Sequence, residues 1–413
     1  MEFYLFAHFG PNTFTNKEWG KGDEPENVFN PTMLDCRQWC RIAKAAGAKG
    51  IIITAKHHDG FCLWPSKFSS HTVRESKWKN GKGDVLKELS QACKEYKLHF
   101  GVYLSPWDRN HPKYGTNEYN TVFVNMMKEI FHNYGPIWEL WWDGANGEGP
   151  NGKKQIYDWH RFEKTVHAIS PGTLIFSDIG PGIRWVGNED GIAGETNWNT
   201  LDTVGFKRGE GAPPTISLTQ GNKAGKNWIP AECDVSIRPG WFYHKEDDEK
   251  VKTPGQLFNL YLKSVGRGAN LLLNVPPDRR GLINEIDSAS LVDFQILRKN
   301  NFGNNLIKIP PVINLVDGKA EIALTKSSQI NGIILRENLK YGQHCEEFEL
   351  MLIDAKGELV KKVQGTTIGR CRIITFPSVT VSKIHLGIVK QIGMTNINAL
   401  EAYFLAEELI EKK

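Results

Sequence analysis

Short apolar runs alternate with longer amphipathic segments between residue 3 and about residue 300. In the amphipathic segments, such as 84–97 and 120–135, apolar positions recur at spacings of three and four, which is typical of helices. The apolar runs are short and bounded by polar or turn residues, which is typical of buried strands. Seven clear runs lie at 3–10, 48–58, 98–107, 136–144, 172–180, 228–236 and 269–278, and a weaker run lies at 191–198.

Buried strands that alternate with helices predict a parallel sheet. About eight such units in roughly 300 residues match the size of a (β/α)8 or TIM-like barrel. An open, doubly wound sheet is the alternative, but no helix here opens with GxGxxG or GxxxxGK[ST]. Polar and aromatic residues also gather where the apolar runs end, in HFG, KHHDG, SPWD, WWDG, ECD and PPD. Because the active site of a TIM barrel lies at that end of its strands, the pattern favours the barrel.

The pattern changes after about residue 310, where helical periods become rare and strands separated by turns follow one another. The expected strands lie within 332–339, 348–363, 371–389 and 401–409. The stiff segment IPPV at 309–312 marks a boundary. We therefore expect an α/β catalytic barrel in 1–300, a linker in 301–310 and a C-terminal all-β sandwich in 311–413, which would serve as an accessory or carbohydrate-binding-like domain.

Composition narrows the classes of function. The formal charge of +4 on 413 residues is small and spread along the chain, so it gives no footprint for nucleic acid. No apolar run approaches the ~20 residues of a membrane span, and the first residues predict a core strand rather than a signal peptide. The seven cysteines are scattered and odd in number, and Cys36 and Cys40 lack the CxxC partners of a zinc site. Buried free thiols are therefore expected.

The stretch KHHDGFCLW at 56–64 contains two adjacent histidines just after an apolar run. Successive side chains of a strand point to opposite faces, so His57 and His58 cannot easily coordinate one metal ion together. Neither His-x-His nor HExxH occurs in the sequence, which disfavours a metal site. Two interpretations remain: a structural pair bonded to the backbone, or recognition of a polyol, since neutral imidazole both donates and accepts hydrogen bonds.

Tryptophans strengthen the interpretation as a sugar site. Any one of the 13 could simply pack in the core, but many occupy the segments where the predicted strands end. These are Trp19, Trp64, Trp107, Trp141, Trp142, Trp185 and Trp241. Aromatic rings suit the C–H faces of sugars, so we expect a carbohydrate site at the carboxyl ends of the strands.

Cleavage of a glycosidic bond usually needs two carboxyl groups. Asp143 in WWDGANG directly follows a fully apolar strand, where a carboxylate must be hydrogen-bonded or take part in chemistry. A strand-capping aspartate is the structural alternative. Several acids further along the chain could be the partner, and their residue types do not distinguish between them. They are Glu189, Asp190, Glu195, Glu232 and Asp234.

Seven segments together resemble the α-L-fucosidases of glycoside hydrolase family 29, in particular the branch that acts on α-1,3/1,4-linked fucose. They run in order across the predicted barrel, at 8–20, 54–66, 101–110, 141–147, 184–191, 228–244 and 264–282. By this resemblance the nucleophile is the aspartate of the W-[WF]-D-G strand end, which is Asp143. The acid/base resembles the glutamate of WVGNE, which is Glu189.

The resemblance also implies a fucose pocket. Its members would be His8, Glu18, Trp19, His57, His58 and Tyr103. The strand-end tryptophans Trp64 and Trp141 are further candidates, and Arg184, Trp185, Glu232 and Asp234 are candidates for contacts with the sugar beyond fucose. Fucose is a 6-deoxy sugar, so such a pocket must offer polar partners to three hydroxyls and an apolar wall to a methyl group.

The implied reaction is retaining double displacement through a fucosyl-enzyme, with no metal or organic cofactor. Glu189 would have to start protonated, and Asp190 with nearby aromatics could raise its pKa. The substrate would be a fucosylated oligosaccharide or glycoconjugate of Lewis type, and the enzyme periplasmic or secreted. A catalytically disabled fucose-binding lectin and a metal-dependent barrel hydrolase are the alternatives.

Overall fold

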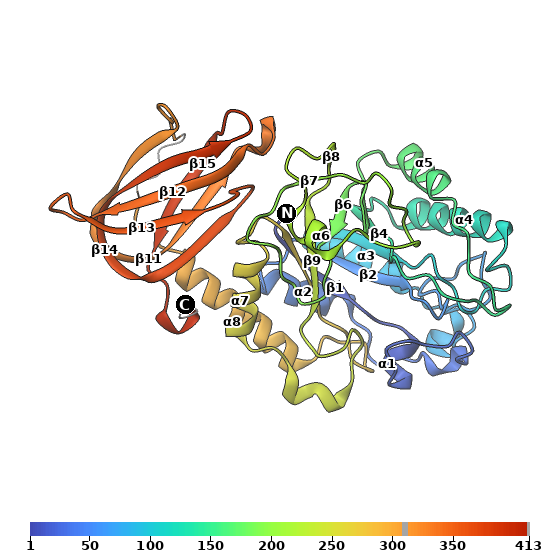
Figure 1. Ribbon diagram of the computed structural model, residues 1–413. Helices are drawn as coiled ribbons and strands as arrows, with labels where there is room; N and C mark the ends of the chain where they lie inside the picture. Colours follow the sequence, from blue (N-terminus) through green and yellow to red (C-terminus); the bar gives the residue numbers. More distant parts are fainter. Residues whose placement is uncertain (308–312, 411–413) are drawn as a thin grey trace.

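The computed structural model describes residues 1–307 and 313–410. A barrel surrounded by helices lies beside an all-β domain, drawn in orange and red in Figure 1. Helix α8 (Glu285–Phe302) is the last element of the barrel unit, and strand β11 (Lys319–Glu337) is the first of the β domain. The linker expected at 301–310 therefore overlaps the end of α8, and the boundary expected at 309–312 lies outside the described residues.

Eight parallel strands close into the expected barrel. In order around the barrel they are β1 (Phe3–Ala7), β10 (Asn270–Asn274), β9 (Ala231–Ser236), β6 (Ile183–Trp185), β5 (Leu174–Ser177), β4 (Glu139–Trp141), β3 (His99–Leu104) and β2 (Gly50–Lys56). The weak run at 191–198 was wrongly predicted as a strand. The eighth strand is instead β6, which has three residues and pairs with β5 and β9. Only five residues, with no helix, separate it from β5, so neither length nor periodicity marks it.

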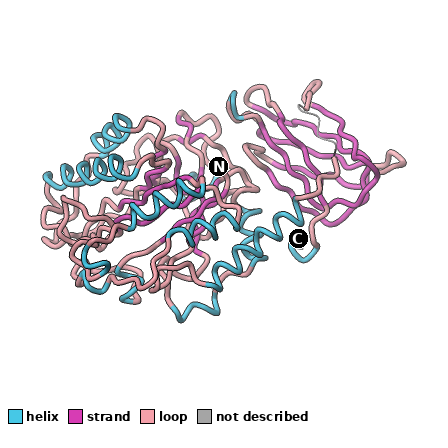
Figure 2. Tube along the Cα trace, turned by 180° about the vertical axis from the view of Figure 1, so that it is seen from behind, coloured by secondary structure: helices cyan, strands magenta, loops and turns pink. Residues whose placement is uncertain are grey.

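Helices surround the barrel, and Figure 2 shows them outside the strands. They are α2 (Cys36–Ala45), α3 (Val85–Tyr96), α4 (Asn117–Tyr134), α5 (Trp159–Ile169), α7 (Pro254–Lys263) and α8, with the shorter α1 (Pro11–Thr15) and α6 (Thr215–Gln220) in loops. Polar side chains begin several of them: Asp84 accepts a hydrogen bond from the Lys87 N–H at the start of α3. Thr253 and Gln256 form a reciprocal capping box on α7.

Alternation along the strands divides the apolar residues into two sets. On β1, Phe3, Leu5 and Ala7 belong to the large cluster shared with the surrounding helices. Tyr4 and Phe6 point the other way and join a second cluster with residues such as Trp141 inside the barrel. This packing fixes the strand ends, so the loops that follow them start from defined positions.

The C-terminal domain is all β, as expected. Its strands β11, β12 (Cys345–Ile353), β13 (Leu359–Gly365), β14 (Arg372–Gln391) and β15 (Ile397–Tyr403) form one antiparallel sheet in the order β13-β12-β14-β11-β15. The long pair β11 and β14 contains two register shifts. Such bulges bend strands, which lets one sheet curve around its own apolar cluster.

The two units share a packed boundary. Ile334, Cys371 and Ile373 of the sheet domain belong to the same apolar cluster as the barrel helices. The Ile373 N–H donates to the Gly266 carbonyl at 2.8 Å. The remaining short elements are the β7–β8 ribbon (Thr200–Leu201 and Asn227–Trp228) and the 3-10 turns Glu26–Val28, Trp78–Gly81, Lys245–Lys250, Leu339–Tyr341 and Glu407–Leu409.

All seven cysteines are buried free thiols, as predicted. Among the described residues, no helix is both long and apolar enough to span a membrane.

Candidate active site

Residues in the carboxyl-terminal parts of the strands and in the loops that follow them surround a cavity of about 150 Å³. Such a volume suits one monosaccharide in a tight pocket. The structure brings many of the predicted site residues together here. The lining is Phe6, His8, Trp19, His57, His58, Tyr103, Trp141, Asp143, Ala145, Glu189, Asp234 and Trp241.

Asp143 stands directly after β4 and faces this cavity. The Tyr103 hydroxyl donates to Asp143 Oδ2 at 2.9 Å, and the Ala145 N–H donates to Oδ1 at 2.7 Å. His58 Nε2 lies 3.7 Å from Oδ2. Each carboxylate oxygen therefore has a donor that fixes its orientation, while about a quarter of the side chain (26%) stays accessible. A fixed, accessible carboxylate at a strand end is suited to attack on a bound sugar.

Three buried histidines line the base of the cavity. Burial lowers the pKa of His8 to about 3 and that of His58 to about 4, and it lowers the pKa of His57 well below the usual value. All three rings are therefore neutral near pH 7. His8 Nδ1 contacts Asn274 Oδ1 at 2.9 Å, and His58 Nδ1 contacts Ser105 Oγ at 2.8 Å.

His57 Nδ1 is different from those two ring nitrogens. It is buried and has no hydrogen-bond partner within the described part of the chain. The other members of the histidine group use one nitrogen for the protein and can offer the second to a ligand. Neutral imidazoles of this kind match sugar hydroxyls, which both donate and accept hydrogen bonds.

Glu189 follows β6 and reaches the same cavity from the opposite loop. The indole N–H of Trp241 donates to Glu189 Oε2 at 3.2 Å. Partial burial raises the pKa of Glu189, the Trp241 hydrogen bond lowers it by a smaller amount, and the negative charge of Asp143 raises it further. Asp143 and Glu189, two of the three carboxyl groups that line the cavity, thus have different environments, which is the usual arrangement of an acid and a nucleophile.

Glu18 lies behind the cavity and holds the loop that carries Trp241. Its Oε2 accepts from the Trp241 main-chain N–H at 2.7 Å, and its Oε1 contacts His244 Nε2 at 2.6 Å. Trp19, next in the chain, is 53% exposed at the rim and its ring packs 5.4 Å from that of His58. The two residues of the predicted Glu-Trp pair therefore have different roles: Trp19 lines the cavity, whereas Glu18 supports its wall.

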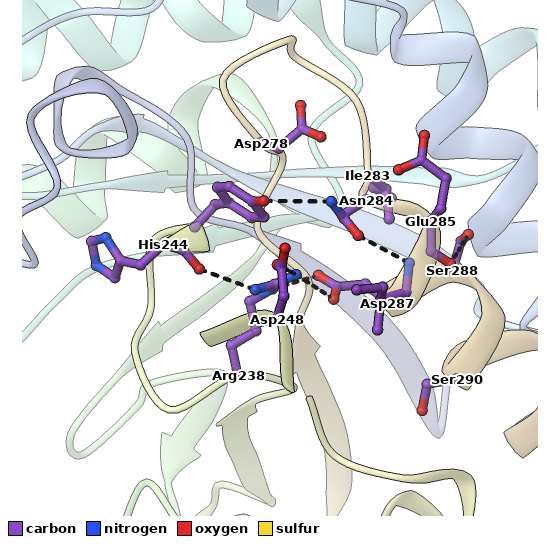
Figure 3. A network of polar contacts seen from close by, with 12 residues as sticks. Arg238, His244, Asp248, Asp278, Ile283, Asn284, Glu285, Asp287, Ser288 and Ser290 are labelled. Carbon is purple, nitrogen blue, oxygen red and sulfur yellow. Dashed lines mark hydrogen bonds and ion pairs between the residues drawn. The ribbon is translucent and has the colours of Figure 1, made fainter. Parts of the chain in front are cut away.

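A second network, shown in Figure 3, fixes the far side of the same loop. The buried guanidinium of Arg238 donates to Asp287 of α8 at 2.9 Å and to the His244 carbonyl at 3.2 Å. It also contacts Asp248 Oδ1 at 3.0 Å. These contacts fix both ends of the 240–248 loop, and so the position of Trp241.

A second cavity of about 410 Å³ opens beside the first one and shares Trp141, Asp143, Ala145, Glu189 and Asp234 with it. Trp185 and Asp178 add an aromatic ring and a carboxyl group to its wall. Burial and then the charge of Asp143 raise the pKa of Asp178 to about 6. The glycine-rich segment 209–212 lines its outer side. Its position next to both carboxyl groups suits the part of a substrate beyond the first sugar.

Besides Glu18, three predicted residues line neither cavity. Trp64 is buried, and its indole donates to Glu129 at 3.1 Å. Arg184 is buried among carbonyl oxygens, including those of Leu218 and Trp198. Glu232 lies inside the barrel, where it accepts hydrogen bonds from the Trp141 indole at 2.9 Å and from the Tyr4 hydroxyl.

Sequence reasoning missed Asp178 as a member of the site, and it named Trp241 only among the strand-end tryptophans and not among the pocket residues. Asp178 lies near the end of the predicted run 172–180 and directly follows β5, so its place at a strand end was a usable signal. Trp241 lies five residues after β9, and its contact with Glu189 depends on loop geometry that no short motif encodes. Ala145, also in the lining, carries no chemical signal at all.

No group of three or more His, Cys, Asp or Glu side chains within residues 1–307 and 313–410 is arranged to hold a metal ion. A larger cavity of about 1190 Å³ lies outside the barrel, between α3 and α4. It contains none of the predicted site residues, so its size alone does not make it the active site.

The closed barrel, the sugar-sized cavity and the pair of unlike carboxyl groups define a site of the glycosidase class. Comparison with known proteins identifies the family. Residues 4–300 match the family described as Alpha-L-fucosidase. Alpha-L-fucosidase 1 of Arabidopsis thaliana is 40% identical over 412 residues, which cover 92% of this chain and 80% of that protein.

Similar solved structures point to the same family. A putative alpha-L-fucosidase from Bacteroides ovatus is 43% identical with a TM-score of 0.89, covering 98% of this chain and 72% of that one. A glycoside hydrolase 29 family member from an unknown rumen bacterium is 40% identical with a TM-score of 0.90, covering 98% and 76%. The chain belongs to the alpha-L-fucosidase family, glycoside hydrolase family 29. It is a glycoside hydrolase that acts on fucosylated glycans, and neither a lectin nor a metal-dependent hydrolase is favoured.

Proposed function

We propose that the enzyme is a retaining exo-α-L-fucosidase in which Asp143 is the nucleophile and Glu189 the acid/base. The observation that carries this assignment is the unequal environment of two carboxyl groups in one small cavity. Asp143 is oriented by two hydrogen bonds, whereas burial and the Asp143 charge raise the pKa of Glu189. A raised pKa keeps the proton that a general acid must give.

In the first step, an oxygen of Asp143 attacks the anomeric carbon of fucose as the glycosidic C–O bond breaks. Glu189 transfers its proton to the departing oxygen, and an ester between Asp143 and fucose forms. In the second step, Glu189 takes a proton from water, and the water oxygen attacks the anomeric carbon. The Asp143 carboxylate leaves and fucose is released with its original anomeric configuration.

The lining of the inner cavity accounts for selection of fucose. His8, His57 and His58, neutral near pH 7, offer ring nitrogens to the sugar hydroxyls. Among the described residues, His57 Nδ1 is buried without a hydrogen-bond partner, so this ring nitrogen is not committed to another protein group. Aromatic rings of Phe6 and Trp141 supply apolar surface for the C–H face and the 6-methyl group.

The outer cavity supports a preference for α-1,3/1,4-linked fucose in Lewis-type glycans. It lies directly beyond the two carboxyl groups and combines the Trp185 ring with Asp178 and Asp234. Such a wall would pack on one sugar face and bond its hydroxyls. Glycans of this type are displayed outside cells, which supports a periplasmic or secreted location.

The test is fucose release from three matched substrates: a Lewis-type trisaccharide, 2'-fucosyllactose and p-nitrophenyl α-L-fucoside. Release from the trisaccharide alone supports the narrow specificity and a second-sugar subsite. Cleavage of all three at similar rates contradicts that specificity but leaves the fucosidase activity intact. NMR of the first sugar formed tests retention, because an initial β-anomer would contradict the double displacement.

A further inference from the structure

Glu189 belongs to a tight turn that has no regular secondary structure. Asn188 closes this turn: its Oδ1 accepts from the N–H groups of Asp190 at 3.1 Å and Ile192 at 3.3 Å. Its Nδ2 donates to the Ile192 carbonyl at 2.9 Å. On one side the turn is anchored to β6, since the Val186 N–H donates to the Glu232 carbonyl at 3.0 Å. On its other side it continues into residues 193–199, which therefore share in fixing its orientation.

The segment 193–199 is also irregular, so contacts outside it must hold it in place. Its first residues are attached to the barrel unit. The Ala193 N–H donates to the Lys263 carbonyl at 3.0 Å, and the Gly194 N–H donates to the Thr219 carbonyl at 3.0 Å. Beyond Gly194, several of its partners come from the C-terminal sheet domain.

Gln343 of the sheet domain is inserted against this segment and is only 5% exposed. Its Oε1 accepts from the main-chain N–H of Asn199 at 2.8 Å and from the Asn199 side chain at 2.9 Å. Its Nε2 donates to the Asn197 carbonyl at 2.8 Å. One side-chain amide thus binds the backbone of two residues of the segment.

Thr367 of the same domain adds a fourth hydrogen bond, because its Oγ1 accepts from the Asn197 N–H at 2.8 Å. The Asn197 side chain then continues inward, where its Oδ1 accepts from the buried guanidinium of Arg184 at 3.0 Å. Arg184 also donates to the Trp198 carbonyl at 3.0 Å. Arg184 belongs to β6, next to Trp185 of the outer cavity, so a chain of contacts connects the sheet domain to the site.

We propose that Gln343, supported by Thr367, is a positioning residue for the general acid, so the sheet domain is part of the catalytic unit and not a detachable binding module. This inference rests on the proposed role of Glu189. Without the amide, the Asn197 and Asn199 backbone groups lose buried partners, the segment shifts, and the Glu189 carboxyl no longer reaches the departing oxygen accurately.

The test compares two substrates that differ in their need for a proton. A Lewis-type trisaccharide has a poor leaving group that needs the acid, whereas α-L-fucosyl fluoride releases a small, good leaving group with little help. The variants are Gln343→Met, which keeps the volume but removes the amide, and Thr367→Val, which removes one acceptor with little change of shape. Either one remains informative if the other fails to fold, as checked by its melting temperature.

We expect Gln343→Met to lower kcat/KM for the trisaccharide about tenfold, a part of the 10²–10⁴ that an acid contributes, and to leave kcat/KM for the fluoride within about twofold. The ratio kcat/KM is the readout because it reports the steps up to the fucosyl-enzyme and excludes the later step in which Glu189 acts as the base. Thr367→Val should show the same selectivity with a smaller loss. The matched control is Glu346→Gln, which removes the 2.5 Å ion pair with Lys223 between the two units without touching segment 193–199. It should change neither rate.

Equal losses on both substrates, or no loss on either, for the folded variants would overturn the inference. Glu189→Gln, measured in parallel, separates that result from failure of the proposed function. If Glu189→Gln impairs the trisaccharide alone and Gln343→Met does not, only the positioning role is wrong. If Glu189→Gln lowers kcat/KM equally for the trisaccharide and the fluoride, or for neither, Glu189 is not the acid and the positioning role of Gln343 is also wrong.

Discussion

Trp241 donates its indole N–H to Glu189 Oε2 across 3.2 Å, from a loop that is far from Glu189 in the chain. The main-chain N–H of Trp241 is itself bound by Glu18 at 2.7 Å. Glu189 is exposed enough to reach substrate and water, yet this contact limits where its carboxyl can point. The contact also has an electrostatic effect, because it counteracts part of the rise in the pKa of Glu189.

Removal of this hydrogen bond should shift the pH profile. In Trp241→Phe the Glu189 pKa rises further, because the donor that stabilised the charged carboxylate is gone. The alkaline limb of kcat/KM, where Glu189 loses its proton, should therefore move to higher pH. The measurement is kcat/KM against pH for both proteins. A limb that stays in place or moves to lower pH would contradict the assignment of Glu189 as the titrating acid.

Asp143→Ala should abolish turnover while the fold persists. The nucleophile is lost, so we expect kcat to fall by about 10⁴-fold or more. Asp143 is partly accessible, and Ala removes no apolar packing, so the melting temperature should change little. Fucose release and thermal unfolding are the two readouts. Activity near that of the wild type would remove Asp143 from the reaction.

Glu189→Ala should lose most activity on oligosaccharides. Azide should accelerate its turnover of α-L-fucosyl fluoride, whose good leaving group lets the fucosyl-enzyme form without the acid. A small anion can occupy the vacated space and attack the fucosyl-enzyme without a general base, giving fucosyl azide. Glu195→Ala and Glu232→Ala serve as comparisons, since both were candidates on sequence alone. Azide rescue in either of these, and not in Glu189→Ala, would reassign the acid/base.

Glu232 should make stability depend on pH. Glu232 and Glu139 are buried together inside the barrel, and burial raises the pKa of Glu232 to about 7. A carboxyl with a raised pKa in the folded state stabilises the fold at low pH, and this contribution is lost as pH rises through the folded pKa. The free energy of unfolding should thus fall from about pH 5 to pH 8, by roughly 1–3 kcal/mol from this group.

Glu232→Gln tests that prediction because it keeps an acceptor for the Trp141 indole but cannot ionise. Its free energy of unfolding, from urea titrations at several pH values, should change less between pH 5 and pH 8 than that of the wild type. The same pH dependence in both proteins would place the titrating group elsewhere. Any loss of activity should be modest, since Glu232 reaches the site only through Trp141.

Periodicity predicted seven of the eight barrel strands and the all-β nature of the C-terminal domain. These elements are long enough to bury an apolar pattern, and burial determines them. Strand β6 escaped prediction because its three residues follow β5 without a helix, and pairing with β9 stabilises it. The segment 191–198, expected as a strand, is instead held by side chains such as Gln343 that lie more than a hundred residues away.

The predictions of site residues were also right where the barrel alone determines a position and wrong where side-chain packing determines it. His57, His58 and Asp143 stand directly at strand ends, so their gathering follows from the barrel alone. Trp64 had a similar sequence context, yet its ring is buried and its indole binds Glu129 outside the barrel interior. Arg184 and Glu232 lie within strands and support the site from beneath. Strand-end position predicts proximity to the site, whereas the direction of a side chain depends on packing that one sequence does not display.

The most direct test of the central claim is to trap the fucosyl-enzyme. A 2-deoxy-2-fluoro-fucosyl donor with a good leaving group slows the second step, so the ester should accumulate and survive digestion. Mass spectrometry of the peptides should show the added sugar on the one containing Asp143, with the label missing in Asp143→Ala. A sugar attached to another carboxyl, such as Asp178 or Asp234, or inactivation without any covalent label, would contradict Asp143 as the nucleophile.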